Sequence, residues 1–114
     1  MRNFKMTLSY DGSRYFGWER QPGKETIQGK LEAVLTRMCG APVNVTGAGR
    51  TDAGVHARAM VANAYMDTDM EPESIRDYLN HYLPDDIGVA EVKEAADRFF
   101  FNDTATTEIY TYTC

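Results

Sequence analysis

Residues 46–57 read TGAGRTDAGVHA and place a carboxylate, a guanidinium and an imidazole among small residues. Asp52 is flanked by glycines and alanines, so a bulky substrate could approach the backbone beside it closely. An exposed aspartate in such a place can act as a nucleophile or as a general base. A plain hairpin connection, in which the glycines only give backbone freedom, explains the composition equally well.

The same segment lacks the features of three common binding sites. The glycines are not followed by the Lys-Ser/Thr pair of a P-loop, and the segment lacks the strand-to-helix setting of a dinucleotide fingerprint. Asp52 and His56 have no further ligands at a useful spacing, so we predict no metal site.

A second segment with possible function is YDGSRYFGWERQ at residues 10–21, where aromatic residues alternate with Arg14 and Arg20. Such a mixture suits stacking on bases and contact with phosphates. Packing in the core is the commoner role of aromatic side chains, and we expect it for Trp18. Arg14 and Arg20 are therefore the better candidates for RNA binding.

Hydrophobic periodicity predicts the elements that position these segments. The expected elements are a strand at 4–10, a helix between Thr26 and Gly40, strands at 42–45 and 58–66, a helix from about Pro72 to before Pro84, and strands at 87–92 and 108–112. The order β-α-β-β-α-β predicts an α+β fold: a ferredoxin-like antiparallel sheet with the helices on one face. The glycine-rich loop would then join the second and third strands.

Composition sets the broad class. The 114 residues form one domain, and no apolar stretch approaches the roughly 18 residues of a membrane span. Cys39 and Cys114 predict neither a disulfide framework nor a zinc site, so we expect a cytoplasmic protein.

The net charge of −5 is unevenly distributed along the chain. Residues 1–58 have nine Lys and Arg against five Asp and Glu, whereas residues 59–114 have three Lys and Arg against twelve Asp and Glu. A basic patch for nucleic acid is therefore compatible with the acidic whole.

Three segments taken together, YDGSRYFGW, TIQGKLE and GAGRTDAGVHA, closely resemble the amino-terminal half of the tRNA pseudouridine synthase A (TruA) family over residues 4 to about 98. The resemblance implies isomerisation of uridine to pseudouridine in the anticodon stem-loop of tRNA, without a cofactor. It identifies Asp52 as the catalytic residue, attacking the sugar carbon or the base, or removing a sugar proton. Arg50 would displace and hold the extruded nucleotide, and Tyr110 would pack against the target base. Further candidates for substrate binding are Arg14, Arg20 and His56.

The resemblance also sets expectations about what this chain lacks. The family has a second half that supplies an arginine to the catalytic aspartate, and its members are homodimers. We expect residues 1–114 to form only the amino-terminal domain and to show little or no synthase activity alone. From about residue 100 to residue 110, the sequence resembles the translation of a sequencing adapter. It does not resemble the sequence with which the family continues after Phe99.

Two other functions fit parts of the sequence. One is a non-catalytic RNA-binding module on a ferredoxin-like sheet. The other is an aspartic hydrolase, because residues 51–54 are similar to a DTG loop. That second class is essentially all-β, and the amphipathic helix expected after Thr26 argues against it.

Overall fold

The structure, a computed structural model, describes residues 1–96 and 111–113. Its elements follow the predicted order, which confirms the α+β, ferredoxin-like fold class. They are β1 (Arg2–Tyr10), the short 3-10 helix η1 (Gly12–Arg14), α1 (Ile27–Cys39), β2 (Val45–Gly47), β3 (Val55–Met66), α2 (Pro72–Tyr82), β4 (Ile87–Ala95) and β5 (Thr111–Thr113).

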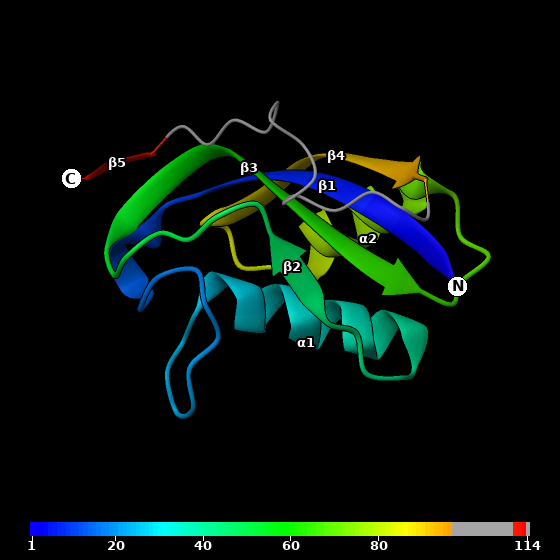
Figure 1. Cartoon of the computed structure of the whole chain (residues 1–114), viewed down its shortest axis with the longest axis horizontal. Helices are drawn as coiled ribbons and strands as arrows, with labels where there is room; N and C mark the ends of the chain where they lie inside the picture. The colour runs from blue at the N-terminus through cyan, green and yellow to red at the C-terminus, as the bar shows by residue number, and fades with distance from the viewer. Residues whose placement is uncertain (97–110, 114) are drawn as a thin grey trace.

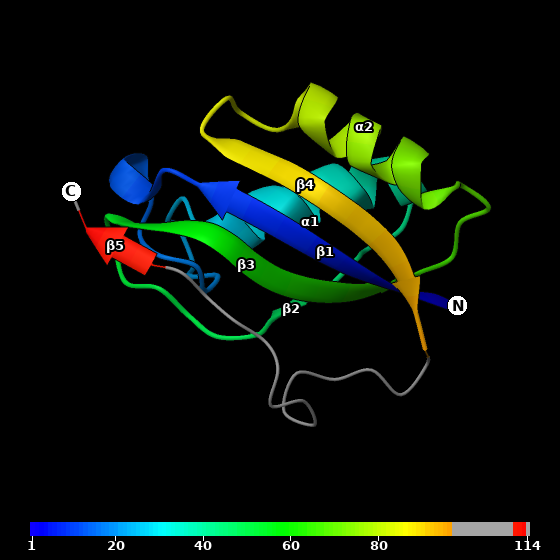
Figure 2. The same ribbon diagram turned by 90° about the horizontal axis from the view of Figure 1, so that it is seen from above.

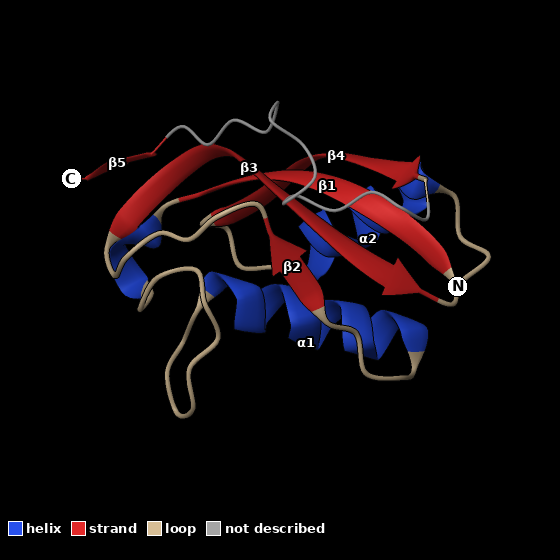
Figure 3. Cartoon of the chain, in the orientation of Figure 1, coloured by secondary structure: helices blue, strands red, loops and turns tan. Residues whose placement is uncertain are grey.

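The strands form one antiparallel sheet in the order β2-β3-β1-β4. Both helices cover the same face of this sheet, as Figure 1 shows from the side and Figure 3 shows by element type. Seen from above in Figure 2, the strands run over α1, and α2 lies alongside β4. The backbone of β5 pairs with the first residues of β3, Val55 to Ala57.

The core lies between the sheet and the helices. On β1, alternate residues Phe4, Met6 and Leu8 are completely buried, as the two-residue period of a half-buried strand requires. The helices bury apolar residues at intervals of three or four: Ile27, Leu31 and Leu35 on α1, and Ile75 and Leu79 on α2. Among the described residues, no helix is long and apolar enough to cross a membrane.

The predicted ends of α1 are confirmed. The Thr26 side chain accepts a hydrogen bond from the Gly29 N–H (3.2 Å) and so caps the first turn. Gly40 follows the last turn with a φ of 71°, a left-handed conformation that glycine adopts without strain.

Two predicted details were wrong. Residues 42–44 are not part of the second strand, because the Val43 N–H donates to Thr36 Oγ1 on α1 (3.0 Å) instead of to the sheet. The third strand begins at Val55 instead of Arg58. Tyr82, in the last turn of α2, is 46% exposed and lies against Tyr78 and His81.

Candidate functional site

Asp52 and Arg50 lie on the loop that joins β2 to β3, as predicted. The loop begins where the Ala48 N–H donates to the Val61 carbonyl (2.8 Å) and closes where the Val55 N–H donates to the Asp52 carbonyl (3.1 Å). Gly54 completes this turn with a φ of 79°. The Asp52 side chain is exposed, whereas its neighbour Thr51 is buried.

The segment that follows β1 braces this loop on both sides of Asp52. The Trp18 N–H donates to the Thr51 carbonyl (3.0 Å), and the Gly54 N–H donates to the Tyr15 carbonyl (3.2 Å). Inside the fold, Tyr10 Oη and Thr51 Oγ1 lie 2.7 Å apart and share a hydrogen bond. The two segments singled out from the sequence are therefore one structural unit.

Glycines allow the close approach of these two segments. A Cβ on Gly17 would lie 2.5 Å from the Thr51 carbonyl oxygen, and Gly17 has a φ of 91°. A Cβ on Gly47 would lie 2.6 Å from Trp18 Nε1. Gly47 thus makes room for the buried Trp18 indole. The glycines of the segment 46–57 therefore do not all provide clearance for a substrate.

Asp52 and Arg50 line the same pocket, whose volume is about 420 Å³. Its lining residues are Phe16, Glu19, Gln21, Lys24, Arg50, Thr51, Asp52 and Ala53. Arg50 Nη1 forms an ion pair with Glu19 Oε2 at 2.8 Å, and both side chains are largely exposed. Such a pair is weak and can be exchanged for another anion, because water screens it.

Arg14, Arg20 and His56 are not among the residues that line this pocket. Arg14 Nε donates to Asp86 Oδ2 (2.8 Å), and Arg20 forms an ion pair with Glu32 on α1. His56 is 2% exposed, and its Nδ1 accepts a hydrogen bond from the Gly12 N–H (2.9 Å). The structure thus holds these three side chains against other parts of the protein.

Asp86 lies in the turn between α2 and β4 and is hydrogen-bonded to the segment between β1 and α1 that supports the Asp52 loop. It accepts hydrogen bonds from Tyr15 Oη (2.7 Å) and Arg14, and its carbonyl accepts from the Asp11 N–H (2.9 Å). Burial together with the neighbouring carboxylate raises the pKa of Tyr15 to about 12. Burial opposes ionisation of Asp86, but hydrogen bonds from Tyr15 and Arg14 outweigh it, and the pKa of Asp86 lies below its ordinary value.

Sequence reasoning missed Lys24 and Gln21, and it did not single out Phe16 from the other aromatic residues. Gln21 Nε2 donates to the Phe16 carbonyl (2.8 Å), and Lys24 Nζ lies 4.4 Å from the centre of the Phe16 ring. The only feature of the sequence that could have indicated these three residues is that they lie close to Trp18 along the chain.

Tyr110 and the adapter-like segment at about 100–110 lie outside the described residues. Within the described part of the chain, no group of three or more His, Cys, Asp and Glu side chains could hold a metal ion.

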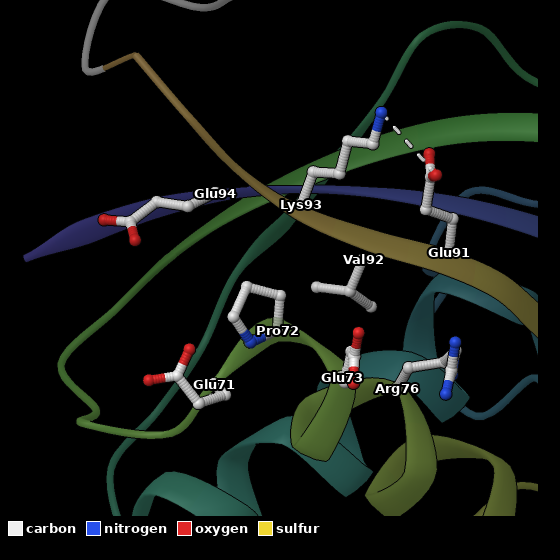
Figure 4. Close-up of a pocket in the computed structure, with 8 residues that line it drawn as sticks. All are labelled: Glu71, Pro72, Glu73, Arg76, Glu91, Val92, Lys93 and Glu94. Carbon is white, nitrogen blue, oxygen red and sulfur yellow. Dashed lines mark ion pairs between the residues drawn. The ribbon is translucent and has the colours of Figure 1, made fainter.

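A larger pocket, of about 620 Å³, lies between the start of α2 and β4 (Figure 4). It contains none of the predicted site residues. Its charged lining residues are Glu71, Glu73, Glu91 and Glu94 against Arg76 and Lys93. Four carboxylates against two cations repel a phosphate backbone, so this pocket is unsuited to RNA.

Comparison with known proteins identifies similar sequences. A sequence model of the family described as tRNA pseudouridine synthase matches residues 6–101. The tRNA pseudouridine synthase A of Bacillus sp. (strain KSM-64) is 46% identical over 113 residues, covering 98% of this chain and 46% of that protein. The tRNA pseudouridine synthase A of Caldicellulosiruptor saccharolyticus is 39% identical over 112 residues, again covering 98% of this chain and 46% of the relative. The chain therefore spans about half the length of the relatives that it matches.

Proposed function

Because this chain belongs to the tRNA pseudouridine synthase family, we propose that it provides the aspartate half of a site that isomerises uridine in the anticodon stem-loop of tRNA. The observation that carries the proposal is the position of Asp52. Its exposed carboxylate lies beside Arg50 in one pocket, on a loop that is hydrogen-bonded to the rest of the fold on both sides.

The reaction is compatible with a site built around one carboxylate. The bond between N1 of uracil and C1′ of ribose breaks, and the base turns. A bond then forms between C5 and C1′, while C5 loses its proton and N1 gains one. No net oxidation or reduction occurs, so the reaction needs no cofactor. Asp52 would act as a nucleophile toward the sugar carbon or the base, or as a base toward a sugar proton.

Arg50 would hold the nucleotide after it leaves the base stack, a step that costs a few kcal/mol. Its guanidinium can exchange the Glu19 carboxylate for a phosphate, because both side chains of the pair are largely exposed. Arg14 and Arg20 would contact the backbone of the tRNA only after giving up Asp86 and Glu32.

The complete enzyme would need a second half. The relatives are about twice as long as this chain, and we propose that their remaining half contributes an arginine that pairs with the aspartate. The chain of 114 residues, an amino-terminal domain, would then be nearly inactive by itself, and the full-length protein would act as a cytoplasmic homodimer.

Tritium release from tRNA labelled at uridine C5 tests this function, since the isomerisation expels that hydrogen. We expect little release by the chain alone and robust release when it is joined to the remaining half of the Bacillus relative. In this joined protein, Asp52→Asn should reduce release by at least about 100-fold and leave tRNA binding intact. Asp67→Asn, in an exposed loop away from the pocket, is the matched control.

The alternatives give different results. A non-catalytic RNA-binding module would bind tRNA without any release from the joined protein, and that result would contradict the proposal. An aspartic hydrolase is inconsistent with the observed fold, because that class is essentially all-β whereas this chain has two helices on one face of its sheet.

A further inference from the structure

We propose that Phe16 and Lys24 form a second nucleotide subsite in the Asp52 pocket. It would take the base and phosphate of an unpaired nucleotide that adjoins the target uridine. This inference rests on the proposed function, because it takes RNA to be the ligand. It assigns a role to two residues that the isomerisation itself does not need.

The exposure of Phe16 is the first observation. The other aromatic residues of this segment, Tyr10, Tyr15 and Trp18, are all at least 95% buried, whereas Phe16 is 48% exposed. Hydrogen bonds fix its backbone, because the Phe16 N–H donates to the Glu25 carbonyl (2.8 Å) and its own carbonyl accepts from Gln21. A ring held on a fixed backbone at a pocket wall is a platform for base stacking, and it does not discriminate between bases.

The charge of Lys24 is the second observation. Three arginines near the two segments, Arg14, Arg20 and Arg50, each form an ion pair with a carboxylate. Lys24 forms no ion pair with any described residue, and its ammonium group lies over one face of the Phe16 ring. A base that stacks on this face would displace the ammonium group from the ring toward a phosphate. Lys24 is therefore a cation of this pocket that can meet a phosphate without first leaving a carboxylate.

The position of the pair determines which nucleotide it would contact. Phe16 and Lys24 line the same pocket as Asp52 and Arg50, so a nucleotide stacked on Phe16 would be a close neighbour of the one at Asp52. Single-strand binding sites combine an aromatic platform with nearby cations in this way. The neighbour would be recognised by shape and charge and not by the edge of its base.

Binding of a fluorescein-labelled anticodon stem-loop RNA to the 114-residue chain tests the subsite. Phe16→Leu keeps an apolar side chain but removes the aromatic face, and it should weaken binding roughly 5- to 100-fold. Phe16→Trp should retain the affinity. Lys24→Gln should lower the slope of log Kd against log salt concentration by about 0.7, the change expected for one lost phosphate contact.

The chain offers a matched control far from the pocket. Tyr82 is 46% exposed, and the Arg37 guanidinium lies 5.3 Å from the centre of its ring. Tyr82→Leu and Arg37→Gln should leave the affinity and the salt slope as they are in the unsubstituted chain.

Failures of the two proposals are distinguishable. Unchanged binding by Phe16→Leu and Lys24→Gln, or equal losses from the Tyr82 and Arg37 controls, would overturn the subsite and leave the proposed function standing. Failure of the unsubstituted chain to bind the hairpin at all would overturn the subsite, whereas tritium release from the joined protein decides the proposed function separately. Circular dichroism melts of each variant identify a loss of fold, and Phe16→Trp then decides whether the aromatic face is needed.

Discussion

At the scale of single residues, the pocket holds as much negative as positive charge. Glu19 and Asp52 lie against Arg50 and Lys24 among its lining residues. Since Glu19 pairs with Arg50 at 2.8 Å, the carboxylate competes with an incoming phosphate for the same guanidinium. If the pocket binds RNA as proposed, Glu19 would therefore weaken that binding.

Replacing that carboxylate should strengthen RNA binding. We expect Glu19→Gln to tighten the binding of the anticodon stem-loop by up to about fivefold, since an exposed ion pair contributes about 0.2–1 kcal/mol. Fluorescence anisotropy at low salt measures the change. Glu91→Gln alters the net charge equally on β4, where Glu91 pairs with Lys93. Equal gains from both variants would show an effect of net charge and not of the released arginine.

At the scale of elements, the Asp52 loop depends on the segment between β1 and α1. Backbone hydrogen bonds from Trp18 to Thr51 and from Gly54 to Tyr15 fix the loop on both sides of Asp52. The close contact of the two segments leaves no room for a Cβ at Gly17. The packing of these two backbones therefore holds the loop that carries Asp52.

A methyl group at this contact should separate the two segments. We expect Gly17→Ala to lower the free energy of unfolding by about 1–3 kcal/mol through overpacking against Thr51. Gly23→Ala is the matched control, because Gly23 also has a positive φ, of 71°, but a Cβ there would meet nothing within 4 Å. Urea unfolding measures both variants. Equal losses would show that backbone strain at positive φ explains the whole effect.

At the scale of the whole molecule, hydrogen bonds to Asp86 connect the segment between β1 and α1 to the turn before β4. Unfolding of the domain exposes Tyr15, whose pKa then falls from about 12 to about 10. The stabilisation that depends on the neutral phenol is therefore complete below about pH 10 and is lost as the pH rises through about 12.

The stability of the domain should accordingly decrease across this alkaline range. Thermal melts at a series of pH values should show Tm falling above about pH 10, and Tyr15→Phe should make the fall shallower. The same variant should cost about 1 kcal/mol at neutral pH, because it removes a hydrogen bond to Asp86. Tyr82→Phe, at an exposed tyrosine, serves as the control. An unchanged alkaline profile in Tyr15→Phe would rule out this linkage.

The fold was predictable because its signals are local. The two-residue alternation of β1, the three-to-four-residue spacing on α1 and the ends at Thr26 and Gly40 all lie within short stretches of sequence. Residues 42–44 were assigned wrongly because Val43 bonds to a side chain on α1, and local pattern does not contain that information. The roles of Asp52 and Arg50 in catalysis and substrate binding stay predictions.

The sequence by itself determined the order of the elements, the family and the loop that presents Asp52. Only the tertiary structure decided which cations near that loop are engaged by carboxylates. Arg14 pairs with Asp86, 72 residues away, and Arg50 pairs with Glu19, 31 residues away. Hydrophobic periodicity is set by neighbours along the chain, but an ion pair depends on where the fold places distant segments. For that reason the exposed Phe16 and Lys24 became visible only in three dimensions.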